Sequence, residues 1–155
     1  MKNGIKLIIC LLIPLAVGAI SGFATMENIS GWYSMLNKPS FNPPNYLFGP
    51  VWTALYILMG ISSYIIVRDH PQQMKGTAGS IYFIQLALNF AWSFIFFSFH
   101  QVGFALLEII TLWVCIVTMI VVFYRLNKTA GLLQVPYLLW VTFASVLNAS
   151  IYYLN

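Results

Sequence analysis

Aromatic and carboxamide side chains recur at helical spacing within three long apolar stretches of this sequence. In one set the spacings are four, three and four residues, which places its members on one face of a helix: Gln85, Asn89, Trp92 and Phe96. The other two sets are Trp52, Tyr56, Gly60 and Ser63, and Tyr137, Trp140, Ala144 and Asn148. Amides in hydrocarbon are costly unless they are paired, so we expect these faces to point inward. Such faces either line a ligand cavity or hydrogen-bond one helix to another, and both interpretations stay open.

A proline-rich segment, residues 32–44, precedes the first of these stretches. It has three prolines within six residues, and proline fixes backbone angles, so the segment has a preset shape. The side chains in it that could bind a ligand are Trp32, Tyr33, Asn37 and Phe41. A stiff aromatic segment of this kind either covers a ligand cavity or anchors the protein at the membrane surface, where Trp and Tyr are common.

Conventional catalytic sets are absent from the sequence. The acids are Glu27, Asp69 and Glu108, and none of them shares an apolar stretch with a histidine. We expect His70 and His100 to lie in loops on opposite membrane faces, where they cannot bind one metal ion or haem iron together. There is also no glycine-rich phosphate loop. We therefore predict no metal site and no ordinary acid–base or nucleophilic catalysis.

Glu108 is the one carboxylate expected within a membrane span, about two turns from the end of its helix. Its side chain could reach the membrane surface, pair with a hydroxyl or amide, or bind a cation. We favour a structural partner.

Composition places the whole chain in a membrane. Of its 155 residues 61% are hydrophobic and 6% are charged, whereas about a quarter of a typical soluble domain is charged. The net charge of +4 comes from bases dispersed at segment ends, which is unlike a nucleic-acid-binding face. Nothing alternates with the period of two that a membrane barrel needs. The fold class that we predict is all-α, as an integral membrane bundle.

Five membrane-spanning helices and one domain, residues 1–155, follow from the apolar stretches. Each stretch has 21 to 24 residues, enough to cross a hydrocarbon core of about 30 Å. The expected spans are 5–25, 46–67, 79–99, 103–124 and 131–154.

The basic residues predict the orientation in the membrane. Six of them fall on the side of the N-terminus, and Lys38 alone falls on the other side. The positive-inside rule therefore places the N-terminus of this multi-pass protein in the cytoplasm and the proline-rich segment outside.

Two pairs of small residues four apart allow close helix approach: Gly18 with Gly22, and Ala87 with Ala91. We expect the glycine pair to pack within the bundle. The alanine pair lies off the amide face, so it is a candidate contact between two copies of the chain.

The aromatic and proline motifs, taken in order, resemble those of the translocator protein or tryptophan-rich sensory protein (TspO/MBR) family, including its bacterial members. The motifs are Trp32-Tyr33, Leu36, Lys38-Pro39, Phe41, Pro43-Pro44, Gly49-Pro50-Val51-Trp52, Leu55-Tyr56, Gly60, Gln85, Asn89, Trp92-Ser93, Phe96-Phe97, Pro136-Tyr137-Leu138, Trp140, Phe143-Ala144 and Leu147-Asn148. They cover nearly the whole chain.

The resemblance implies a five-helix bundle, commonly a homodimer, in a bacterial cell membrane. It implies binding of tetrapyrroles such as protoporphyrin IX or haem, and of isoquinoline or benzodiazepine-type drugs, with no tightly bound cofactor. It also implies light- and oxygen-dependent degradation of the porphyrin, in which Trp52 and Trp140 would flank the ligand and take part. The other ligand-binding residues that it implies are Tyr33, Pro43, Pro44, Leu47, Phe48, Tyr56, Gln85, Asn89, Phe143 and Asn148.

The last residues depart from the animal members of the family. Those end on an aromatic-x-Arg/Lys motif proposed for cholesterol, whereas this chain has no base among residues 151–155, so we do not expect cholesterol as a partner. Two alternatives to photochemical degradation remain: transport of porphyrin or another apolar ligand, and a non-catalytic stress sensor or scaffold. The few charges within the spans disfavour ion-coupled transport.

Overall fold

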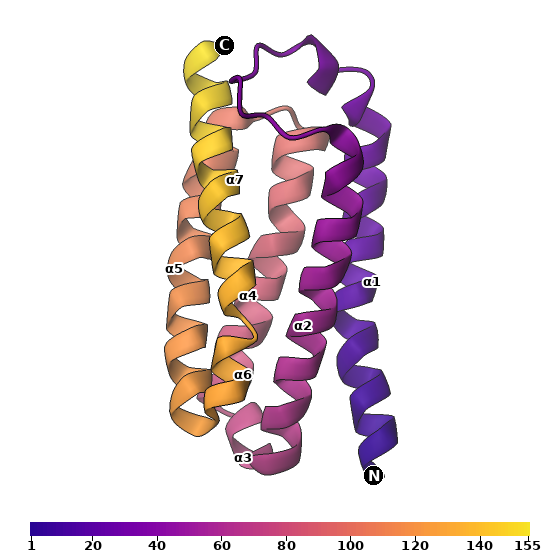
Figure 1. The fold of residues 1–155 in the computed structure, drawn as a ribbon, viewed down its shortest axis with the longest axis vertical. Coiled ribbons are helices and arrows are strands. Elements are labelled where there is room, and N and C mark those ends of the chain that lie inside the picture. Colours follow the sequence, from indigo (N-terminus) through magenta and orange to yellow (C-terminus); the bar gives the residue numbers. More distant parts are fainter.

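Helices connected by short segments account for almost the whole chain. The computed structural model describes residues 1–155 and contains no strand. Five helices are long and apolar enough to cross a membrane, which confirms the predicted all-α, multi-pass bundle. The elements, shown in Figure 1, are α1 (Asn3–Ile29), η1 (Tyr33–Met35), η2 (Asn45–Leu47), α2 (Phe48–Asp69), α3 (Pro71–Met74), α4 (Thr77–Ser93), η3 (Phe94–Ser98), α5 (Val102–Leu126), α6 (Lys128–Leu132) and α7 (Val135–Leu154).

Two of the spans differ from the uninterrupted helices that hydropathy predicts. The fifth is split into α6 and α7, and Pro136 falls in the first turn of α7, where its missing N–H costs no helical hydrogen bond. The third ends in a π-helical turn, η3, in which the Phe99 N–H donates to the carbonyl of Phe94 at 2.8 Å.

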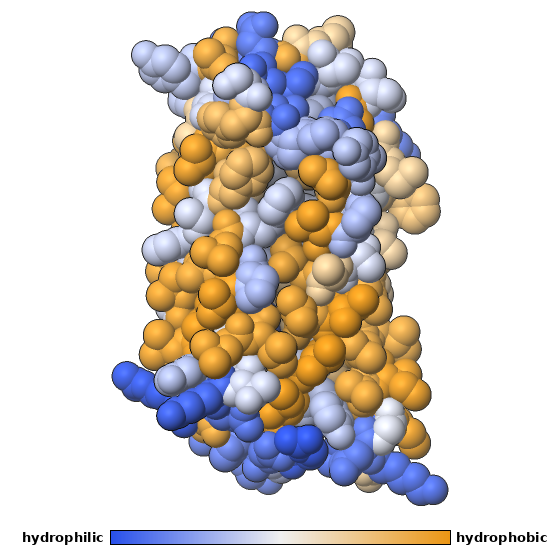
Figure 2. Space-filling model, in the orientation of Figure 1, coloured by the Kyte–Doolittle hydropathy of each residue, from blue (hydrophilic) through white to orange (hydrophobic).

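On the face shown in Figure 2, an apolar band covers the middle of the molecule, and polar side chains gather at its two ends. The N-terminus lies at one end and the C-terminus at the other (Figure 1). We call the first the basic end, because it holds Lys2, Lys6, Arg68, Lys75, Arg125 and Lys128. The second is the loop end, where residues 30–47 cross the top of the bundle with Lys38. This distribution agrees with the charge pattern, while the cytoplasmic placement of the N-terminus stays a prediction.

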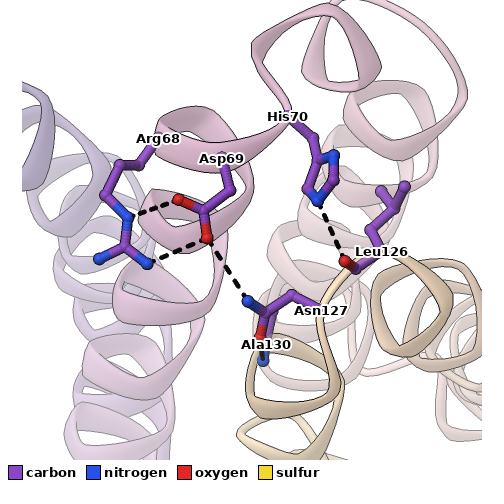
Figure 3. Close-up of polar contacts among 6 residues, drawn as sticks. All are labelled: Arg68, Asp69, His70, Leu126, Asn127 and Ala130. Atoms are coloured by element: carbon purple, nitrogen blue, oxygen red, sulfur yellow. Dashed lines mark hydrogen bonds and ion pairs between the residues drawn. The ribbon is translucent and has the colours of Figure 1, made fainter.

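Polar contacts join α2 to the α5–α6 junction at the basic end (Figure 3). Asp69 pairs with Arg68 at 2.7 Å and accepts from the Asn127 amide at 3.5 Å. His70 donates through Nε2 to the carbonyl of Leu126 at 3.0 Å. Exposed ion pairs contribute little free energy, so we infer that this cluster fixes geometry more than it adds stability.

The first two spans touch backbone to backbone in the half of the bundle nearer the basic end. A Cβ on Gly60 of α2 would stand 2.8 Å from the Cys10 carbonyl oxygen and 2.9 Å from the Leu11 Cα of α1. One on Gly18 would stand 2.5 Å from the Tyr56 ring, so Gly18 packs within the bundle as predicted. Gly22 does not: nothing lies within 4 Å of where its Cβ would be. The seam between α1 and α2 is therefore closely packed at Gly60 and Gly18 and loosely packed at Gly22.

Candidate functional site

A cavity of about 710 Å³ lies in the half of the bundle nearer the loop end. This volume is within the usual range for small-molecule sites, about 300–1,000 Å³. Its walls come from α1, α2, the end of the third span and α7, with Tyr33 from the loop. The predicted site residues that line it are Tyr33, Phe48, Trp52, Tyr56, Trp140, Phe143 and Asn148. Segments far apart in the sequence therefore enclose one space.

No charged side chain lines this cavity, and no histidine does. Its polar groups are hydroxyls, indole and amides carried on a mostly apolar surface. A molecule that fits must therefore present an apolar body to the walls and keep any charged group at the cavity mouth, because burying an unpaired charge is costly.

Aromatic rings form a corner at the centre of the cavity wall. The ring centroids of Trp52 and Trp140 are 6.4 Å apart with the ring planes at 90°. Trp52 also stacks on Tyr56 at 5.7 Å, and Trp140 contacts Phe143 at 5.5 Å. Indoles packed in this way bring two electron-rich faces to one space, as a flat apolar ligand requires.

Two buried hydrogen-bond donors in the cavity wall have no partner. They are the Trp140 indole Nε1 and the Ser21 hydroxyl, and Ser21 is 4% exposed. Hydroxyls in membrane helices commonly donate to the carbonyl four residues earlier, as Thr25 and Ser145 do here. Ser21 does not, so its buried hydroxyl is left without a partner in the bundle.

Below the cavity, phenols and amides form a buried hydrogen-bonded layer that joins α2, α4 and α7. Tyr56 donates to Asn89 Oδ1 at 2.6 Å, and the Asn89 amide donates to the Tyr137 hydroxyl at 2.8 Å. Tyr137 donates in turn to Gln85 Oε1 at 2.8 Å. Gln85 and Asn89 point inward as expected, but they do not line the cavity. Their geometry matches the interhelical alternative, and a ligand contact by either stays a prediction.

Asn89→Ala is expected to destabilise the bundle by roughly 1–3 kcal/mol, because it removes two interhelical hydrogen bonds and leaves the buried Tyr56 hydroxyl without its acceptor. Thermal unfolding in one detergent would measure the change. Thr118→Ala is the matched control, since Thr118 bonds only within its own helix and is exposed. Equal stability of the two variants would mean that the layer contributes nothing.

The loop over the cavity is held by its own side chains. Tyr33 is 2% exposed, and its hydroxyl donates to Asn42 Oδ1 at 2.8 Å. Burial raises the pKa of the Tyr33 phenol to about 12, so it stays a donor at physiological pH. Lys38 donates to the carbonyls of Tyr33 and Leu36 at 2.9 and 3.1 Å. The loop is thus anchored from within.

A second anchor ties the loop to the end of α7. The Asn37 N–H donates to Asn155 Oδ1 at 3.1 Å, and the Asn155 amide returns a bond to the Asn37 carbonyl at 2.9 Å. Three other predicted binding residues, Pro43, Pro44 and Leu47, follow this anchored part and do not line the cavity.

Asn148 lines the cavity with its hydrogen bonds already made. Its Oδ1 accepts from the Trp92 indole at 3.1 Å, and its amide donates to the Val102 carbonyl at 3.0 Å. We infer that Asn148 positions Trp92 in the wall.

The first span supplies much of the cavity wall, and no site residue was predicted in it. It contributes nine lining residues: Leu15, Gly18, Ala19, Ser21, Gly22, Phe23, Thr25, Met26 and Ile29. The small residues Gly18, Ala19, Ser21 and Gly22 were the available signal, but we interpreted the glycine pair as a packing contact alone. Small residues also leave space when no partner fills it.

The structural partner that we expected for Glu108 is absent. Both carboxylate oxygens are buried and have no hydrogen-bond partner. Glu108→Gln removes any cost of burying a charge there, so we expect a gain of roughly 1 kcal/mol in thermal unfolding. Glu27→Gln, at an exposed position, is the control and should change nothing. A loss of stability in Glu108→Gln would instead reveal a cation or other partner on the carboxylate.

Comparison with known proteins gives the family. The sequence pattern of the TspO/MBR family matches residues 10–154, which is nearly the whole chain. The chain belongs to the TspO/MBR family. It is 42% identical to the tryptophan-rich protein TspO of Archaeoglobus fulgidus, over 99% of both chains. It is 41% identical to TspO of Chlorobaculum tepidum over 99% of this chain and 98% of the other. To the translocator protein of Sus scrofa it is 35% identical, over 85% and 82% of the two chains.

Membership in the TspO/MBR family confirms the resemblance seen in the motifs. The motifs lie in the elements that enclose the cavity: the loop, the beginning of α2, the end of the third span and α7. The chain is therefore a multi-pass TspO/MBR membrane protein with one large uncharged cavity.

Proposed function

We propose that this TspO/MBR protein binds a tetrapyrrole such as protoporphyrin IX in the cavity and promotes its light- and oxygen-dependent degradation. The observation that carries the proposal is the corner of two indoles, Trp52 and Trp140, in an uncharged cavity of about 710 Å³. A tetrapyrrole is a large, flat, mostly apolar disc, and aromatic faces with a few donors suit it.

The free donors of the cavity support this ligand class. Trp140 Nε1 and the Ser21 hydroxyl lack partners, and a small side-chain rotation would turn these buried donors toward the nitrogen or carbonyl acceptors of a ring. The carboxylates of a porphyrin would remain at the cavity mouth, because no cation lines the interior.

Photochemistry needs no acid–base set from the protein. The ligand absorbs the light, and the protein holds it against groups that exchange electrons with it. Indole is an electron-rich partner for a photoexcited ring, so Trp52 and Trp140 are the groups that we assign to that role. In this assignment the protein binds the photoexcited porphyrin and exchanges electrons with it.

Illumination of the purified protein with protoporphyrin IX tests the proposal. In the dark, we expect quenching of tryptophan fluorescence on binding and a stable porphyrin absorbance. In light and oxygen, the absorbance should fall faster than for porphyrin without protein, and removal of oxygen should stop the loss. Binding without light-dependent loss would leave the sensor or scaffold alternative. Absence of dark binding would reject the ligand class.

Passage of the ligand across the membrane is the competing function. Beyond the cavity the bundle is filled by a buried cluster that includes Met59, Ile66, Tyr82, Leu112 and Met119, which favours a closed site over a through-channel. Uptake of protoporphyrin IX into protein-containing vesicles in the dark, faster than into empty vesicles, would support transport instead.

We also propose that isoquinoline or benzodiazepine-type drugs occupy the same cavity and that two copies associate. Competition of such a drug with protoporphyrin IX tests the first point. Ala87 lies exposed on the surface of α4, away from the amide face, so cross-linking through Ala87→Cys in membranes tests the second. Only monomers after cross-linking would count against this contact.

A further inference from the structure

The space around four glycines shows how closely α1 and α2 approach each other along the seam between them. At Gly60 and Gly18 an added Cβ would stand 2.8 Å or less from atoms of the other helix. At Gly22 on α1 and Gly49 on α2 nothing lies within 4 Å, and both residues line the cavity. The two helices are therefore in contact in one half of the membrane and part from each other in the other half.

Side chains beside this opening line the cavity and are also exposed on the outer surface. Phe23 and Met26 of α1 are 69% and 73% exposed, and Tyr46 before α2 is 75% exposed. In a membrane-spanning bundle such apolar surface faces lipid. The cavity consequently communicates with the bilayer through the seam between α1 and α2.

A route into the cavity from water, under the loop, is closed more firmly than this lateral route from lipid. Tyr33 is buried, and the loop is tied to the end of α7 by three hydrogen bonds between Asn37 and residues Leu154 and Asn155. To open this route the loop must break several hydrogen bonds at once. The lateral opening breaks none, since no hydrogen bond crosses the seam at Gly22 or Gly49.

We propose that the ligand enters and leaves the cavity sideways, between Gly22 and Gly49, directly from the membrane leaflet at the loop end. The inference rests on the proposed function and specifies its substrate. The substrate is a flat molecule with an uncharged ring system, dissolved in lipid, and any carboxylates that it carries lie at the membrane surface. Delivery from the bilayer also explains an uncharged cavity wall, because lipid already excludes molecules with charge in their core.

Filling the opening tests the route through binding kinetics. Gly22→Phe adds a ring at a position where an added Cβ has no atom within 4 Å, so the fold should be retained. In nanodiscs preloaded with protoporphyrin IX, we expect both association and release, followed by tryptophan fluorescence, to slow by at least roughly tenfold, which is about 1.4 kcal/mol in each barrier. Gly4→Phe, also in open space on α1 but outside the cavity, is the matched control. Unchanged rates in Gly22→Phe would overturn the proposal.

Locking the loop tests the alternative route. The variant Asn37→Cys with Asn155→Cys, in a background with Cys10→Ser and Cys115→Ser, places two thiols at the residues that now bond through the Asn37 backbone and the Asn155 side chain, and its disulfide is formed by oxidation and verified by mass. We expect the same association rate with the disulfide formed and reduced. A rate that falls on oxidation would place the entrance under the loop and overturn the lateral route.

Lipid itself provides a readout that does not depend on the porphyrin. With Trp32→Phe and Trp113→Phe, the remaining indoles, Trp52, Trp92 and Trp140, all line the cavity. In vesicles of phosphatidylcholine brominated on its acyl chains, we expect their fluorescence to be quenched, and Gly22→Phe to reduce the quenching. Unquenched cavity indoles would show that the seam is closed to lipid. Quenching without porphyrin binding would leave the opening in place and reject the proposed ligand.

Discussion

Replacement of both Trp52 and Trp140 by phenylalanine is expected to slow the light-dependent loss of bound protoporphyrin IX by at least roughly tenfold, which corresponds to about 1.4 kcal/mol. Phenylalanine keeps an apolar aromatic face in the wall, so most of the dark affinity should remain. It is much harder to oxidise than indole, so the electron exchange with the excited ligand should fail. Affinity and photochemistry are thereby separated.

The measurement compares the rate of absorbance loss per bound porphyrin with the dark affinity from fluorescence or absorbance titration. Trp113→Phe is the matched control: Trp113 faces outward from α5, bonds to Thr142 at 2.7 Å and does not line the cavity. Porphyrin bound to Trp113→Phe should lose its absorbance in light at the same rate as porphyrin bound to the parent protein. If the double variant bleaches and binds like the parent, the two indoles have been wrongly assigned.

Hydropathy and helical periodicity were sufficient for the bundle and for its inward faces. A run of 21 or more apolar residues is long enough to cross a membrane as a helix, and amides in hydrocarbon must turn toward partners. Gln85, Asn89 and Tyr137 are accordingly buried. Spacing alone did not separate residues that line the cavity from those that bond beneath it, because both kinds lie on the same helix face. Tyr56 lines the cavity and Gly60, one turn away, does not; likewise Trp92 lines it and Asn89 does not. Which member of each pair lines the cavity depends on how deep the cavity reaches into the bundle.

Contacts between segments far apart in the sequence could not be predicted. The bond between Asn37 and Asn155 joins residues separated by most of the chain, and neither belongs to a periodic pattern. The wall formed by α1 was missed for a related reason. A pair of small residues four apart predicts close approach, but whether a partner fills the gap depends on the neighbouring helix. Gly18 meets Tyr56, whereas Gly22, one turn later, meets nothing.

Gly60→Leu is expected to destabilise the protein by about 3 kcal/mol or more, because it forces a large side chain into a contact between two backbones. The new side chain would meet backbone atoms of Cys10 and Leu11 at less than 3 Å, and backbone cannot move aside as a side-chain tip can. Helix α1 would have to separate from α2 in the half of the bundle nearer the basic end. In thermal unfolding, we expect a fall in Tm on the order of 10 °C.

Gly22→Leu is the control in the same seam, with the same residues exchanged. Because nothing lies within 4 Å of its Cβ, the fold should keep its stability, and leucine favours the helix over glycine by roughly 0.5–1 kcal/mol. A similar loss of stability in both variants would mean that the helices are as close at Gly22 as at Gly60. Opposite outcomes would show why the cavity stays open beside a stable bundle: the contact at Gly60 holds α1 in place, so the seam at Gly22 can remain unfilled for a ligand.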